Sequence, residues 1–173
     1  DRRLPLFGQF LVIRLRLHHE MLGPHGFVGD HVFMVIGQTP VVTAQLLGDA
    51  LDRLIAIANT HDIEVSLAVI PKEATEALAE RIANEPFVAV LQHGYEHRNH
   101  QDKARGEKAA EFGSRRDADE SIRQLAKGCE RLTALFGPRF VPVFVPPWNR
   151  LSPQIARRLP EAGLVASSTF TQF

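Results

Sequence analysis

Apolar residues follow two different periods along this chain, and the pattern is regular from Thr43 onward. Apolar side chains at spacings of three and four predict three amphipathic helices, over 43–60, 72–84 and 117–136. Short, continuously apolar runs predict buried strands, over 63–70, 87–91, 140–145 and 164–168. Strands that alternate with helices in this way form βαβ units around a parallel sheet.

Residues at the ends of these blocks support the predicted boundaries. Thr43 can cap the first helix through its hydroxyl, and Gly137 with Pro138 ends the third. Ser152 followed by Pro153 predicts the start of a further short helix, because proline is favoured at the first helical position. The pattern therefore indicates both the elements and the places where they stop.

The first 43 residues give a weaker pattern. The segment 7–17 is strand-like, but Arg14 and Arg16 alternate with its apolar residues. The segment 27–36, rich in Val, Phe and Ile, is the better strand candidate. We expect one domain over 1–173, with 1–43 as its least regular part. A closed barrel of eight strands typically needs ~250 residues, whereas four or five strands are predicted here. We therefore expect part of a barrel, and a truncated domain.

Composition excludes several classes of protein. Lys plus Arg is 20 and Asp plus Glu is 20, so no basic excess argues for nucleic acid. No apolar run reaches the ~18 residues of a membrane span. The run 10–13 is broken by Arg14 and Arg16, so no signal peptide is visible and a cytoplasmic location is the default expectation. The single cysteine, Cys129, excludes an intrachain disulfide and a cysteine-based zinc site.

The richest candidate chemistry follows the predicted strand 87–91. His93, His97 and His100 lie within eight residues there, and the chain has 8 histidines in all. Imidazole is the commonest metal ligand in proteins, and two at i and i+4 in a loop can close on one cation. Gly94 allows a tight reversal between them. Zinc sites that are catalytic use three protein ligands, and Asp30 is the leading third candidate, with His31 as its rival.

A second constellation follows the predicted strand 140–145. It consists of Pro146, Pro147, Trp148, Asn149 and Arg150. Two prolines fix the backbone beside the chain's single tryptophan, whose ring can stack on a sugar face while Asn and Arg supply hydrogen bonds. Such a wall suits a carbohydrate pocket. A rim tryptophan beside an ordinary Pro-Pro turn explains the same residues equally well.

A third segment, 107–113, lies in the long polar stretch after the histidines. Long loops in compact domains are often functional. Its sequence, Glu-Lys-Ala-Ala-Glu-Phe-Gly, is charged at three of seven positions. We therefore expect a solvated loop here rather than a catalytic element.

The first two motifs together resemble the polysaccharide deacetylase family of chitooligosaccharide-deacetylase-like carbohydrate esterases. The segments Gln-His-Gly-Tyr-Glu-His-Arg-Asn-His, beginning at Gln92, and Val-Pro-Pro-Trp-Asn-Arg, beginning at Val145, are similar to variants from a bacterial branch of it. The resemblance covers roughly 43–169. It implies a distorted (β/α) barrel, a divalent metal, usually zinc, and removal of an acetyl group from a sugar.

The resemblance also implies roles for particular residues. His93 and His97 match the metal histidines, and Asp30 matches the metal aspartate or the catalytic base. Pro146, Pro147 and Trp148 match the motif that forms the wall of the groove. We expect Tyr95, Asn149 and Arg150 to contact the sugar as well. The chain departs from the family pattern at Gly29-Asp30-His31, which has one carboxylate where two are usual, and it has no histidine after His100.

Three other functions remain compatible with the sequence. A sugar-binding or metal-binding domain without catalysis would fit the single carboxylate. A plain α/β domain with a structural histidine cluster would bind no metal. A metal hydrolase acting on other C–N bonds is also open, because a fold does not fix a substrate.

Overall fold

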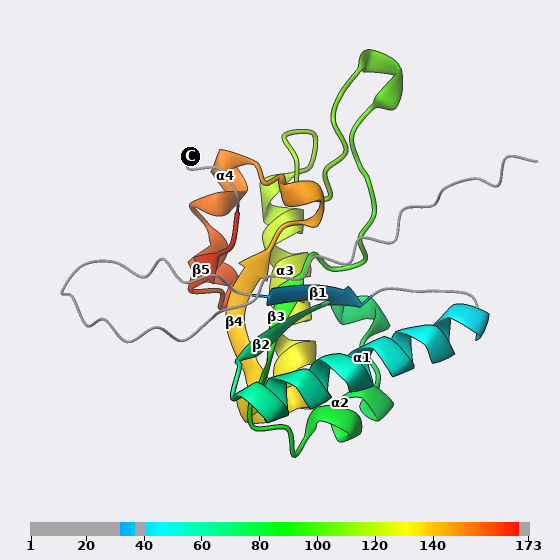
Figure 1. Ribbon diagram of the computed structural model, residues 1–173. Coiled ribbons are helices and arrows are strands. Elements are labelled where there is room, and N and C mark those ends of the chain that lie inside the picture. The colour runs from blue at the N-terminus through cyan, green and yellow to red at the C-terminus, as the bar shows by residue number, and fades with distance from the viewer. Residues whose placement is uncertain (1–31, 37–40, 170–173) are drawn as a thin grey trace, which may run out of the picture.

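The computed structural model describes residues 32–36 and 41–169, with side chains from residue 48. In this part of the chain, five parallel strands form one sheet in the order β1-β2-β3-β4-β5 (Figure 1). The strands are β1 Val32–Ile36, β2 Val65–Val69, β3 Val88–His93, β4 Phe140–Val145 and β5 Ala166–Ser167. The α-helices are α1 Val41–His61, α2 Glu76–Ile82, α3 Ala118–Phe136 and α4 Pro153–Ala156. Short 3-10 turns are η1 Pro71–Glu73, η2 Lys103–Arg105, η3 Gly137–Arg139, η4 Pro147–Asn149 and η5 Leu159–Ala162. The predicted parallel α/β architecture is therefore confirmed.

Most predicted boundaries agree with the structure to within two or three residues. β4 has the predicted bounds, and α3 begins after Asp117, whose side chain accepts a hydrogen bond from the Glu120 N–H. The predicted strand 27–36 is β1 over its second half, and its first half lies outside the described residues. α1 begins at Val41, so Thr43 lies inside that helix rather than at its cap.

The predicted helix 72–84 is wrong in its first turns. Pro71 begins η1, the chain becomes extended at Ala74, and α2 starts only after Thr75, whose side chain accepts the Leu78 N–H. Arg131 of α3 donates to the carbonyl oxygens of Pro71 and Ala74, both at 2.8 Å. These charged hydrogen bonds satisfy carbonyls that a continuous helix would have used internally.

The sheet buries its two faces differently, because successive side chains of a strand point to opposite sides. On one face, Leu67 and Val90 belong to the main core cluster, together with α1, α2 and the C-terminal half of α3. On the other face, Ala68 and Leu91 form a smaller cluster with Val143 against them. His93 follows Leu91 by two residues and so lies on this second face.

The carboxyl ends of β3 and β4 meet at one edge of the sheet. The two strands pair in parallel, and His93 is the register partner of Val145, the last residue of β4. The long segment after β3 and the turn η4 after β4 therefore leave the sheet together, and Figure 1 shows both projecting at the same end. In parallel sheets this is the edge where active sites are built.

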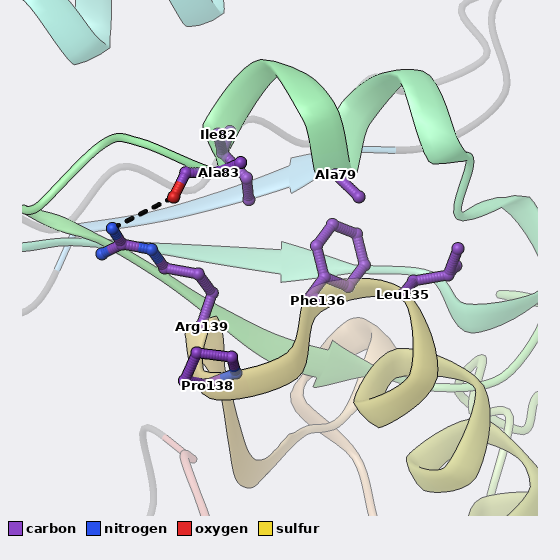
Figure 2. A pocket seen from close by; sticks show the side chains of 7 residues that line it. All are labelled: Ala79, Ile82, Ala83, Leu135, Phe136, Pro138 and Arg139. Carbon is purple, nitrogen blue, oxygen red and sulfur yellow. Dashed lines mark hydrogen bonds between the residues drawn. The ribbon is translucent and has the colours of Figure 1, made fainter.

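A cavity of about 310 Å³ lies elsewhere, between α2, the end of α3 and η3 (Figure 2). Ala79, Ile82 and Phe136 line it, and Arg139 crosses its rim to donate to the Ala83 carbonyl at 3.3 Å. Arg139 precedes β4, so the cavity adjoins the opposite edge of the sheet from His93. It is a gap between packed helices and holds none of the predicted site residues.

None of the helices in the described part of the chain combines the length and the hydrophobicity of a membrane span.

Candidate functional site

His93 ends β3 with its ring buried, at 4% exposure. Its Nδ1 lies 2.9 Å from the carbonyl oxygen of Val145, and a carbonyl can only accept, so Nδ1 carries the proton. Nε2 then keeps its lone pair. Burial lowers the pKa of His93 to about 3, and the nearby His97 adds to this effect. The ring is therefore neutral near pH 7, and a neutral imidazole held by a backbone carbonyl is the usual state of a metal ligand.

His97 approaches His93 from the turn that follows. The two ring centroids are 5.1 Å apart and the ring planes are inclined by 35°. The backbone of His97 is left-handed, with φ at 56°, and burial lowers the pKa of its half-buried imidazole. The structure therefore brings the two predicted histidines together, in the uncharged form that binds metal.

Gly94 makes this close approach possible. Its φ is 62°, a region where a side chain adds strain. A Cβ built there would collide with the carboxylate of Glu111 and would lie 2.7 Å from Cγ of Pro147. Glycine is therefore required at position 94 for two reasons: the backbone is left-handed, and no space is left for a side chain.

Gln92, next to His93, ties the start of the turn to α3. Its side chain is fully buried, and Nε2 donates to the carbonyls of Gly94, at 3.2 Å, and Leu125, at 3.1 Å. Oε1 of the same amide has no hydrogen-bond partner within the described structure. Burying this amide costs free energy. Its two hydrogen bonds hold the end of β3, which carries His93, against α3.

Glu111 corrects the expectation of a solvated loop over 107–113. Its side chain has 0% exposure, and its carboxylate accepts the backbone N–H groups of Tyr95 and Glu96. Burial raises the pKa of Glu111 to about 7, although these N–H groups favour the charged form. The only signal in the sequence is that Glu111 stands between Ala110 and Phe112, both of which are buried as well.

The second predicted constellation lies against the first. Trp148 sits in η4, and its ring centroid is 4.3 Å from that of His97. Its backbone is left-handed, with φ at 54°, which is costly for a bulky residue and is found mainly where function requires it. The tryptophan predicted for a sugar-binding wall is therefore adjacent to one of the predicted metal ligands.

The other predicted site residues occupy several different positions. Tyr95 packs against a further core cluster, which includes Phe112 and Phe144, and Nζ of Lys127 lies 5.8 Å from its ring centroid. Arg150 donates to the Ala109 carbonyl at 3.0 Å. Asn149 is left-handed like its neighbour, with φ at 55°. Pro146 and Pro147 are buried. The third-ligand candidates Asp30 and His31 lie outside the described residues.

The described residues supply two donors for a metal ion rather than a full set. Between 48 and 169 no group of three or more His, Cys, Asp or Glu side chains is arranged to hold one. The chemistry of the two donors fits zinc, since imidazole nitrogen is one of its preferred ligands and the tautomer of His93 is fixed by a carbonyl. A third ligand would have to come from the remaining part of the chain.

Fold and geometry together define a class of protein: a parallel α/β domain with paired imidazoles at the carboxyl edge of its sheet. Among solved structures, the fold is similar to a protein from Mycobacterium smegmatis described as a polysaccharide deacetylase. The TM-score is 0.51 at 20% identity, over 68% of this chain and 37% of that one. A family 4 acetyl xylan esterase from Clostridium thermocellum, solved with a cobalt ion, gives a TM-score of 0.48 at 17% identity, over 72% and 51%.

The likeness to the Mycobacterium smegmatis protein confirms the predicted fold, that of an incomplete deacetylase-type (β/α) barrel. The chain spans about 37% of the Mycobacterium smegmatis protein, which is well under two thirds of its length. No protein family profile matches this sequence. No curated protein matches it either.

The lowered pKa of His93 makes stability depend on pH. The folded chain keeps this ring neutral down to about pH 3, whereas the unfolded chain protonates it near the ordinary value of 6.5. The unfolded state thus binds more protons between these values, so the free energy of unfolding falls as the pH falls through this window. The slope from this one group reaches about 1.4 kcal/mol per pH unit.

We expect the variant H93Q to lose that slope in urea unfolding measured across the same window. The raised pKa of Glu111 acts in the opposite direction, favouring the fold as the pH falls from about 7 toward 4.5, and it is common to both proteins. Parallel pH profiles for the wild type and H93Q would contradict the burial of a neutral His93.

Proposed function

We propose that this chain provides the metal-binding edge of a metal-dependent hydrolase that removes acetyl groups from a carbohydrate. The observation that carries this proposal is the convergence of His93 and His97, with ring centroids 5.1 Å apart at the carboxyl edge of the sheet. The deacetylase-type fold supports it. The proposed cofactor is a divalent cation, zinc by preference.

His93 and His97 would hold the cation, with Asp30 as the proposed third ligand or catalytic base. When bound, a zinc ion polarises a carbonyl oxygen and lowers the pKa of a coordinated water to about 7. The protein contributes the orientation of the ligands. The Val145 carbonyl holds the ring of His93, and burial keeps both imidazoles uncharged and available.

Trp148 is the proposed platform for the sugar. Aromatic faces bind the apolar face of a sugar ring, and this indole is half-buried beside His97. A sugar stacked on it would place an acetyl substituent near the imidazole pair. Pro146 and Pro147 stiffen the wall, and we propose Tyr95, Asn149 and Arg150 as further contacts to the substrate.

The test combines two readouts on one preparation. Acetylated chito-oligosaccharides should quench the emission of Trp148, which is unambiguous because the chain has a single tryptophan. Zinc-loaded protein should also release acetate from them, and chelation should abolish that release. If zinc-loaded protein shows no quenching of Trp148 and releases no acetate, the proposal is refuted.

A second candidate is a catalytically impaired domain that binds sugar or metal. It is favoured by the motif Gly29-Asp30-His31, which has one carboxylate where deacetylases usually have two. General acid and general base roles ordinarily need two titratable groups. Quenching of Trp148 with stoichiometric zinc but without acetate would select this second function.

A further inference from the structure

One buried carboxylate connects the histidine turn to the rest of the domain. We infer that Glu111 is a positioning residue, whose carboxylate binds the backbone of the turn at Tyr95 and Glu96 and thereby sets the orientation of the His97 imidazole. As far as the inference concerns a metal site, it rests on the proposed function.

The contacts of Glu111 are directed at the turn itself. Oε1 lies 2.8 Å from the Glu96 nitrogen and 3.1 Å from the Tyr95 nitrogen, and Oε2 lies 3.2 Å from the Tyr95 nitrogen. Consecutive N–H groups that converge on one anion form a strong, charge-assisted site. These two residues directly precede His97, so fixing their peptide planes restricts where its imidazole can point.

Glu111 is itself held by the core rather than by the exposed part of its loop. Phe112, its neighbour, is fully buried and packs edge-on against Phe144 of β4, with ring centroids 5.7 Å apart. The Phe112 carbonyl accepts the N–H of Ser152 at 2.8 Å. The carboxylate is thus fixed with respect to β4 and to Ser152, which follows shortly after η4, the turn that carries Trp148.

Gly94 completes the arrangement. A side chain there would occupy the place of the Glu111 carboxylate, so the glycine and the glutamate are matched to one another. The Glu111 carboxylate therefore accepts two N–H groups of the turn from the place that a Gly94 side chain would otherwise fill. This is the geometry of a support for the ligand-bearing backbone.

The test compares E111Q with E107Q in the full chain. Glutamine keeps the size of Glu111 but removes its charge. Its oxygen can take the place of Oε1, and its NH2 group then faces the Tyr95 N–H at the position of Oε2, donor against donor. E107Q is the matched control because Glu107 lies in the same loop and pairs with Arg115 and the Asp102 N–H, away from the turn. Two quantities are measured without metal: amide hydrogen exchange at Tyr95 and Glu96, and the chemical shifts of the His97 ring protons. The third is cobalt(II) binding, by its affinity and by the visible spectrum of the complex.

We expect E111Q to speed exchange at Tyr95 and Glu96 at least ~10-fold while the β3 amides keep their protection. The His97 ring protons should shift, because they lie in the ring current of Trp148 at 4.3 Å. Cobalt affinity should fall about 10- to 100-fold, with altered visible bands, as for other residues that support metal ligands. E107Q should leave all three unchanged.

Unaltered exchange at Tyr95 and Glu96 in E111Q would overturn the inference. So would faster exchange accompanied by wild-type His97 shifts, because Glu111 would then stabilise the turn without orienting the ring. If the wild-type protein binds no cobalt, the proposed function fails, and the His97 shifts of the metal-free variants still decide the role of Glu111.

Discussion

The double variant H93A/H97A should lose stoichiometric zinc altogether. Both donors would be gone, so the loss in affinity should exceed the roughly 10- to 100-fold that changes around metal ligands cost. Acetate release, where the wild type shows it, should disappear with the metal. Zinc content after gel filtration and titration against a chromophoric chelator are the measurements, with a urea unfolding curve to show that the variant is folded.

H100A is the control for this experiment. His100 belongs to the same histidine cluster in the sequence, but its Nε2 lies 3.4 Å from the Arg116 guanidinium. Burial lowers the pKa of His100, and the positive charge of Arg116 adds to that effect. We expect H100A to bind zinc as the wild type does. Zinc that persists in H93A/H97A, or that is lost equally in H100A, would rule out the assignment of the pair as ligands.

The second large effect is expected from Gly94→Ala. A left-handed backbone costs an alanine ~1 kcal/mol relative to glycine. The new methyl group would also overlap Glu111 and Pro147, and overpacking of this kind costs about 1–3 kcal/mol more. We therefore expect a loss of about 2–4 kcal/mol in the free energy of unfolding.

Gly106→Ala separates the two contributions. Gly106 has φ at 70°, yet a Cβ there would meet nothing within 4 Å. It should cost only the conformational part, ~1 kcal/mol. Chemical denaturation of both variants gives the difference directly. Equal losses for the two glycine variants would show that the packing of Gly94 against Glu111 contributes nothing.

The sequence predicts the architecture well where local chemistry and tertiary packing agree. α3 has an aspartate cap, a helical apolar stripe and a glycine at its end, and all three signals are local. The helix predicted over 72–84 fails because its first turn is replaced by η1 and the Thr75 cap, with Arg131 binding the freed carbonyls. That arginine is about 60 residues away, so no local pattern could indicate it.

The site is predictable to a smaller extent. Spacing after a strand predicts that His93 and His97 lie close together, and their ring centroids are 5.1 Å apart; their role as ligands stays a prediction. Glu111 is missed because a charged residue in a polar stretch ordinarily faces water, and its burial depends on a turn 14 to 17 residues earlier in the chain. Asp30 remains a prediction, since it lies outside the described residues.

The most direct test of the central claim is an anomalous difference map at the zinc edge from crystals of the zinc-loaded protein. The account predicts one peak ~2.0–2.1 Å from Nε2 of His93 and from a ring nitrogen of His97, with a carboxylate oxygen, proposed to be that of Asp30, as a third ligand. A zinc peak that lies away from both rings would contradict the account. So would a map with no zinc peak near the two imidazoles and rings that point away from each other.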